Sequence, residues 1–309
     1  MRVRRFIWPV IGVGAVIFSV WLLYHELREI SFSELMSSFA AIPPRNWILA
    51  GLSTLVAYAA LAGYDRIALM HLNRHDIPWL YIAITSFTTY ALSHNIGASM
   101  LSGAVIRYRA YAPKGLSAAE VGLLVAFCSF TFVLGVVFLL GVVLVLEPGI
   151  TARFVGILPV EASSATGYLL LGAVALYVTG SAFHFRPLRI GSFALHYPRL
   201  PVVLRQLIIG PIELIGAAGI VYFALPAQGN PGFLVVLGIF MISFSTALIS
   251  HAPGGLGVLE LVFLTALDEM DPAAVLAALV VFRLLYLIVP LVIALFVVLI
   301  YEHSRLGRD

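Results

Sequence analysis

The chain has 309 residues, of which 61% are hydrophobic and only 11% are charged, with a formal net charge of +3. A soluble domain carries about 25% charged residues, so this composition excludes an ordinary soluble protein. Apolar runs long enough to cross a bilayer instead predict an all-α integral membrane protein, a polytopic helical bundle formed by residues 1–309 as one domain. The net positive charge does not predict nucleic-acid binding, because the basic residues gather in the loops on one side of the predicted membrane.

Six apolar runs are predicted to span the membrane. The first follows Arg2, Arg4 and Arg5 and is too long for the core of a signal peptide, so we expect a retained span. The arginines place the N-terminus in the cytoplasm, and the charges of later loops place the C-terminus there too. The six runs are Phe6–Tyr24, Trp47–Tyr64, Val121–Leu146, Tyr168–Phe183, Leu207–Leu225 and Ala273–Ile300.

Two further apolar stretches are broken in the middle. Trp79–Val105 contains Ser93-His94-Asn95-Ile96-Gly97, and Phe233–Leu267 contains Ser250-His251-Ala252-Pro253-Gly254-Gly255. We expect each stretch to form a re-entrant hairpin, the first entering from the cytoplasmic face and the second from the outer face. Ordinary double crossings would leave the flanking loops on the same sides, so this interpretation rests on the breaks and the short arms.

The two broken motifs also predict an internal repeat. Three matches downstream, Ala118-Ala119 with Ala273-Ala274, Phe127 with Phe282 and Glu147 with Glu302, share an offset of 155 residues. An odd number of spans separates the hairpins, so the approximate repeats 47–147 and 207–302 are expected to be inverted. Inverted repeats with interrupted segments in corresponding positions are typical of transporters with a site near the midplane. Chance similarity between apolar helices is the alternative.

The breaks are candidate binding sites because non-helical backbone at membrane depth needs partners or a watery cavity. Proline ends one arm of the second hairpin, and its glycines permit positive φ and close packing. The helix that restarts near Leu256 would aim free amides into the membrane, where they suit a phosphate. A simple packing break is the alternative. The candidate residues are Ser93, His94, Asn95, Ser250, Pro253, Gly254, Gly255 and Gly257.

Four ionisable residues fall within the predicted membrane region: Asp65, Glu213, Glu260 and Arg283. Charges at this depth are rare and usually face a cavity or a partner. A Glu213–Arg283 ion pair is the structural interpretation. In the functional interpretation, the arginine holds a lipid phosphate while the acids receive a cationic group or exchange a proton.

Arg107 and Arg109 are expected just inside the cytoplasmic interface, beside Tyr108 and Tyr111. They are either ordinary interfacial anchors or an entry point for an anionic headgroup. No metal site or cofactor is expected, because two histidines and a single cysteine lack enough acidic neighbours. No catalytic motif of a hydrolase, metalloprotease or nucleotide-binding enzyme occurs, so we expect no enzyme activity.

Two ordered motifs resemble a known family. Leu92-Ser93-His94-Asn95-Ile96-Gly97, followed by Ser102–Arg109 and Gly115-Leu116-Ser117, is similar to the membrane region of bacterial lysylphosphatidylglycerol synthetase/flippase proteins, as is Pro253–Glu260. The resemblance implies an inner-membrane lipid translocase and carries Asp65, Glu213 and Arg283 over as functional residues. Bifunctional members continue into a soluble aminoacyl-transferase domain, whereas this sequence ends at Asp309 and resembles the stand-alone flippase-like branch.

The combined prediction is a lipid flippase of the bacterial inner membrane that moves phospholipid, such as aminoacylated phosphatidylglycerol, between leaflets. The alternatives are a secondary transporter of a small charged solute, a membrane partner of a separate lipid-modifying enzyme, and a lipid-modifying enzyme itself. Anionic or aminoacylated phospholipids are the expected partners. A second copy of the chain and a separately encoded lipid-synthesis enzyme are the protein partners left open.

Overall fold

The computed structural model describes residues 32–96, 99–154, 164–185, 188–190, 193–195, 197–250 and 256–306. The expected first span, Phe6–Tyr24, lies outside these ranges, as do the hairpin residues Gly97, Pro253, Gly254 and Gly255. The side chain of Ser250 also lies outside the described part, although Ser250 is the last residue of its helix. These predictions therefore stay predictions.

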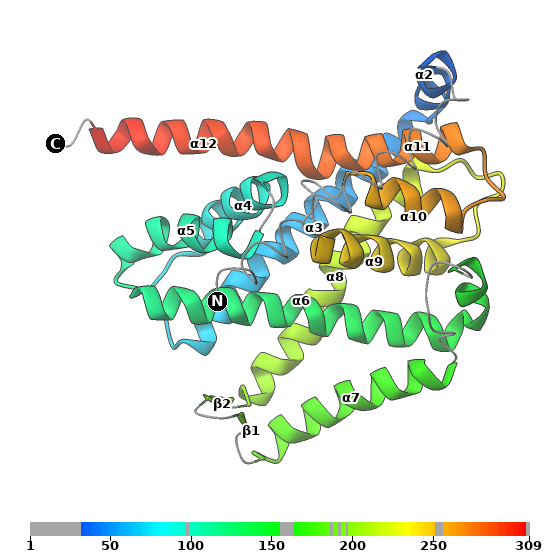
Figure 1. Ribbon diagram of the computed structural model, residues 1–309. Coiled ribbons are helices and arrows are strands. Elements are labelled where there is room, and N and C mark those ends of the chain that lie inside the picture. The colour runs from blue at the N-terminus through cyan, green and yellow to red at the C-terminus, as the bar shows by residue number, and fades with distance from the viewer. Residues whose placement is uncertain are drawn as a thin grey trace, which may run out of the picture.

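Within the described ranges the chain is helical, apart from short loops and one antiparallel hairpin of three-residue strands (Figure 1). The elements are α2 (Phe32–Ala40), α3 (Pro44–His71), α4 (Trp79–Ile96), α5 (Ser99–Tyr111), η1 (Ala112–Lys114), α6 (Ala118–Leu146), η2 (Pro148–Phe154), α7 (Ser164–Ala182), β1 (Leu188–Ile190), β2 (Phe193–Leu195), α8 (Leu200–Ala224), α9 (Phe233–Ser250), α10 (Val258–Ala266), α11 (Pro272–Phe282), η4 (Arg283–Ile288) and α12 (Val289–Leu306).

Five helical segments in these ranges are long and apolar enough to cross a membrane, which confirms a multi-pass helical membrane protein. They correspond to the five expected spans that follow Phe6–Tyr24. The segments are Pro44–His71, Ala118–Leu146, Ser164–Ala182, Leu200–Ala224 and Pro272–Ile300, the last formed by α11, η4 and most of α12.

Local signals explain where several of these helices begin. Proline occupies the first turn of α3, α8 and α11, where a missing N–H removes no helical hydrogen bond. At the start of α6, the Ser117 hydroxyl accepts a hydrogen bond from the backbone N–H of Glu120, and the Glu120 carboxylate accepts one from the N–H of Ser117. This reciprocal capping box satisfies two amides that have no partner within the helix.

The crossing of α3 and α8 forms the centre of the molecule (Figure 1). Gly216 of α8 is buried against the backbone of α3. A Cβ atom at this position would lie 2.8 Å from the Ala57 nitrogen and 2.9 Å from the Ser53 carbonyl oxygen, so no larger residue fits without a shift. Small residues at helix crossings permit close backbone approach in membranes, where apolar surface alone gives little drive for association. The residue at position 216 therefore controls how closely α3 and α8 pack.

The two broken stretches form helix pairs on opposite sides of this crossing, α4–α5 on the left and α9–α10 on the right of Figure 1. The first helix of each stretch ends within its expected motif, α4 at Ile96 and α9 at Ser250, so Ser93–Ile96 belong to the last turn of α4. The second arms have only 13 and 9 residues, or about 20 and 14 Å of helix, well short of the ~30 Å hydrocarbon core. These lengths favour re-entrant pairs, and the re-entrant depth stays a prediction.

A polar clamp joins the turn before α4 to the turn after α5. The Arg74 guanidinium donates hydrogen bonds to the carbonyls of Gly115, at 3.0 Å, and Lys114, and to the Asp76 carboxylate at 3.2 Å. The hydrogen bond from Arg74 lowers the pKa of the exposed Asp76 carboxyl. Gly115 adopts a φ of 81°, which favours glycine at this turn. The clamp ties the loop between α3 and α4 to the turn that follows α5.

We predict that Gly216→Ala lowers the free energy of unfolding by about 1–3 kcal/mol, because the added methyl group would clash with the α3 backbone. Gly51→Ala is the matched control, since a Cβ at Gly51 of α3 meets nothing within 4 Å. This control should leave stability unchanged or raise it by up to about 1 kcal/mol. Thermal unfolding of the purified protein in detergent measures both variants, and equal stability of the two would contradict the close crossing.

Candidate functional site

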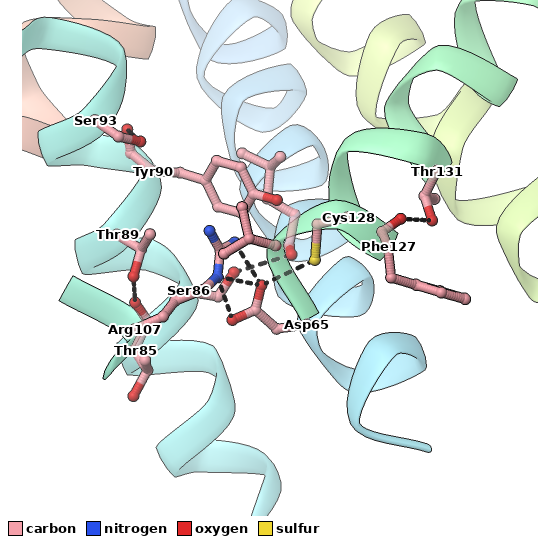
Figure 2. Close-up of polar contacts among 12 residues, drawn as sticks. Asp65, Thr85, Ser86, Thr89, Tyr90, Ser93, Arg107, Phe127, Cys128 and Thr131 are labelled. Carbon is pink, nitrogen blue, oxygen red and sulfur yellow. Dashed lines mark hydrogen bonds and ion pairs between the residues drawn. The ribbon is translucent and has the colours of Figure 1, made fainter. Parts of the chain in front are cut away.

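A buried ion pair joins α3 to α5, the helix that follows the first break. Arg107 Nη2 lies 2.7 Å from Asp65 Oδ1, and Arg107 Nε lies 3.2 Å from both carboxylate oxygens (Figure 2). The Tyr111 hydroxyl donates to Asp65 Oδ2 at 3.1 Å, and Cys128 Sγ of α6 lies 3.6 Å from Asp65 Oδ1. The guanidinium carbon is 4.7 Å from the centre of the Tyr90 ring. Four helices thus contribute to one polar cluster in the apolar bundle.

Arg107 is not the exposed interfacial anchor that is one of the two sequence-based interpretations. Its side chain is only 4% exposed and the Asp65 side chain 0%, so Arg107 is a core residue and not a membrane-surface anchor. Arg109 and Tyr108 are exposed on the same helix, whereas Tyr111 is fully buried. The buried residues 107 and 111 lie one helical turn apart, so one face of α5 points into the bundle and the other away from it.

A second, partly buried ion pair joins α10, the helix after the second break, to η4. Arg283 Nη2 is 2.6 Å from Glu260 Oε1, Arg283 Nε is 2.9 Å from the same oxygen, and the two side chains are 15% and 10% exposed. The other Glu260 oxygen accepts the backbone N–H of Gly257 at 2.8 Å. Gly257 caps α10 with a φ of 79°, as the expected use of glycine at this break requires. Glu260 therefore caps its own helix and holds Arg283 at once.

Arg283 begins a π-helical turn, η4, between α11 and α12. Such turns widen the helix and leave carbonyl groups without their usual partners, and they are frequent at functional sites. The Tyr58 hydroxyl of α3 donates to the Tyr286 carbonyl at 2.8 Å, and the Asn95 amide of α4 donates to the Leu287 carbonyl at 3.1 Å. The last turn of α4, at the first break, therefore supports the turn that carries Arg283.

Glu213 lies between the two pairs, on α8, with 1% of its surface exposed. The Tyr286 hydroxyl donates to Glu213 Oε1 at 2.7 Å, and the Tyr64 hydroxyl makes a longer contact of 3.5 Å with Oε2. The structure does not form the alternative Glu213–Arg283 ion pair, because Arg283 pairs with Glu260 and Glu213 accepts hydrogen bonds from tyrosines. The two charged residues belong to neighbouring but separate clusters.

His94 and Ser93 occupy the end of α4 beside this region. The His94 ring stacks on Tyr286, with centroids 5.6 Å apart and an interplanar angle of 19°, and meets the edge of Phe244 of α9. Its Nδ1 atom is buried and has no hydrogen-bond partner among the described residues. Ser93 is buried and makes a long contact of 3.5 Å with the Tyr90 carbonyl. Asn95, and not these two, makes the hydrogen bond across to η4.

Apart from Tyr111, the tyrosine hydroxyl groups of the site have no distinct sequence signal, because tyrosines are common in apolar runs. No sequence pattern singled out Cys128 as a site residue either. One signal was available: the offset of 155 residues that matches Phe127 with Phe282 also places Cys128 opposite Arg283. Both positions contact a buried carboxylate, Asp65 for Cys128 and Glu260 for Arg283.

Comparison with known proteins agrees with this architecture. The family described as the lysylphosphatidylglycerol synthase TM region matches residues 10–294. The chain belongs to this family. The matched range extends from before α3 to beyond η4 and therefore includes both ion pairs and Glu213.

Relatives include proteins of similar and of greater length. An uncharacterized protein of Synechocystis sp. is 29% identical over 293 residues, covering 94% of this chain and 90% of the relative. The inner membrane protein YbhN of Escherichia coli is 28% identical over 262 residues, covering 81% and 78%. A phosphatidylglycerol lysyltransferase of Staphylococcus haemolyticus is 26% identical over 301 residues, covering 96% of this chain and 34% of the relative. The similarity to the lysyltransferase thus covers about a third of that protein.

We predict that Asp65→Asn and Arg107→Gln each destabilise the protein by about 3–5 kcal/mol, because each leaves an unpaired charge in the core. The double variant should be more stable than either single variant, since it buries no charge. Arg109→Ala, at an exposed position on the same helix, is the control and should cost less than about 1 kcal/mol. Unfolding in detergent measures the set, and additive losses in the double variant would argue against a buried pair.

Proposed function

We propose that the protein moves phospholipid headgroups between the leaflets of a bacterial inner membrane, with both termini in the cytoplasm. The observation that carries this proposal is the presence of two buried guanidinium–carboxylate pairs, one behind each broken helix pair. Charged side chains inside a membrane protein are expensive to bury and typically mark a substrate pathway. The family is a transmembrane one, and the relative YbhN is named an inner membrane protein, which supports the bacterial inner membrane as the location.

The pairs suit a headgroup that contains a phosphate. Two N–H groups of Arg283, on Nε and Nη2, donate to the same Glu260 oxygen, and a phosphate oxygen can take the place of that carboxylate oxygen. The released Glu260 carboxylate would then accept an ammonium group of the same headgroup. Because one charge pair replaces another, no unpaired charge has to be buried during the exchange.

We propose aminoacylated phosphatidylglycerol as the lipid, since it carries both a phosphate and an amino group. The family name and the names of the lysyltransferase relatives support this choice. The relatives from Synechocystis and Escherichia coli align over most of their own lengths with this transmembrane unit, which supports transport without an enzymatic step. Exposed apolar side chains along α12, such as Phe296, Leu299 and Ile300, would contact the acyl chains.

We also infer that residues 47–147 and 207–302 are inverted copies that alternate in exposing the site. Each contains a long helix, a broken pair and a second long helix, in the order α3–α4–α5–α6 and α8–α9–α10–α11 with α12. One ion pair then belongs to each half, and Asn95 of the first half contacts the Leu287 carbonyl of the second. Rocking of one half against the other is the motion expected of such repeats.

The test is translocation of labelled aminoacylated and anionic phospholipids in proteoliposomes. We predict that Arg283→Ala slows translocation by about ten- to a hundredfold, the loss of a charge-assisted hydrogen bond worth about 1.5–3 kcal/mol. Arg283→Lys should retain part of the rate because the charge remains. Arg205→Ala removes an exposed arginine from α8 and serves as the control with unchanged rate.

Folding of each variant is checked by thermal unfolding and by its elution volume in detergent. If proteoliposomes with the parent protein move none of the labelled lipids faster than protein-free liposomes do, the proposal is overturned. Uptake of a soluble amine or phosphate compound by the same liposomes would then favour a solute transporter. Activity that appears only after addition of a lipid-synthesis enzyme would favour the role of a membrane partner.

A further inference from the structure

Glu213 differs from the other two acids of the buried site. The carboxylates of Asp65 and Glu260 each form an ion pair with a guanidinium. Glu213 is as deeply buried, yet no cationic side chain among the described residues forms an ion pair with it. Its partners are the hydroxyl groups of Tyr286 and Tyr64, of which only the first is at a normal hydrogen-bond distance.

A buried carboxylate can be stabilised in two ways, by an ion pair or by binding a proton. Pairing with arginine neutralises Asp65 and Glu260, and a headgroup can take over either partner without any proton transfer. A carboxyl group with only hydroxyl neighbours can lose its charge by binding one proton and regain it by releasing that proton. Intramembrane acids of this kind form the proton relays of pumps and transporters.

We propose that Glu213 is a proton-exchange site that couples proton movement to translocation of the headgroup. The proposal rests on the translocase function proposed above and adds a source of energy to it. The Glu213 carboxylate takes one proton from the aqueous phase on one side of the membrane and becomes a neutral acid. After the site has changed its exposure, the acid releases that proton to the other side and the carboxylate is restored.

The contact with Tyr286 connects this proton to the headgroup site. Tyr286 follows Arg283 by three residues within the same π-helical turn. A hydrogen bond to a charged carboxylate is roughly twice as strong as one to a neutral group, so binding of a proton weakens the hold of Glu213 on that turn. Arg283 begins the same turn and binds Glu260. A change in the protonation of Glu213 would therefore be transmitted through Tyr286 to the Arg283–Glu260 ion pair.

The other titratable groups near Glu213 come from three elements. Tyr64 and Tyr58 lie on α3 and Tyr286 on η4, and His94 of α4 stacks on the Tyr286 ring. Tyrosine hydroxyl groups ordinarily titrate near pH 10, whereas carboxyl and imidazole groups serve exchange near neutral pH. His94 is therefore the one neighbour among these that the experiment has to separate from Glu213.

The experiment imposes a pH gradient on proteoliposomes with the membrane potential clamped. It measures the leaflet distribution of a labelled aminoacylated phospholipid and the internal pH with a trapped dye. For one proton per headgroup, the parent protein should shift the leaflet ratio by up to about tenfold per pH unit, with matching proton flux. Glu213→Gln should abolish both the gradient response and the proton flux, and Glu213→Asp should restore part of each.

Tyr286→Phe and His94→Asn complete the set. Tyr286→Phe removes the hydroxyl donor and should weaken the gradient response, which gives a second readout if Glu213→Gln does not fold. His94→Asn, whatever its rate of translocation, should keep the dependence of the leaflet ratio on the pH gradient. A response that survives in folded Glu213→Gln, or that is lost in His94→Asn alone, would overturn the assignment.

The same experiment distinguishes failure of the two proposals. Translocation by the parent protein that ignores the pH gradient and moves no protons, but is lost in Arg283→Ala, would refute proton coupling and leave the translocase intact. Absence of translocation by the folded parent under every gradient would refute both.

Discussion

The cost of a charge in an apolar interior determines the architecture of this protein. Three buried carboxylates, those of Asp65, Glu213 and Glu260, each accept hydrogen bonds from at least one other element of the fold. Apolar packing between helices has little directional preference in a membrane, whereas an unpaired charge is expensive in nearly every arrangement. The ion pairs and the tyrosine contacts therefore specify which helix faces meet, and the close α3–α8 crossing brings those faces together.

Broken backbone imposes a similar demand, because free amide and carbonyl groups also need partners in this interior. The start of α10 meets the demand through Glu260, which accepts the Gly257 amide and holds Arg283 with its other oxygen. The π-helical turn meets it with donors from α3 and α4, namely Tyr58 and Asn95. The groups that stabilise the irregular backbone are thus the same groups that assemble the polar site.

The ion pairing of the buried charges at Asp65 and Glu260 is the physical basis of the proposed transport cycle. A headgroup that carries a phosphate and an amine offers the same charges as a guanidinium–carboxylate pair, so it can exchange with the pair without leaving an unpaired charge. Glu213 lacks such a pair among the described residues and contacts the same turn that carries Arg283. In the proposed cycle, proton exchange at Glu213 and headgroup exchange at Arg283 act on one short segment, η4, which accepts hydrogen bonds from α3 and α4 and donates one to α8.

The sequence by itself determined the properties that depend on neighbouring residues. Hydropathy located the five spans of the described part, glycine, proline and polar residues located both breaks, and the rarity of deep charges singled out Asp65, Glu213, Glu260 and Arg283. Only the tertiary structure decided the partners: it paired Arg283 with Glu260 and not Glu213, and it buried Arg107 against Asp65. The physical reason is that a side chain meets its partner only after the helix crossings and the π-helical turn have determined which helix faces touch. The partners are far apart in the sequence, so no pattern of neighbouring residues predicts the pairing.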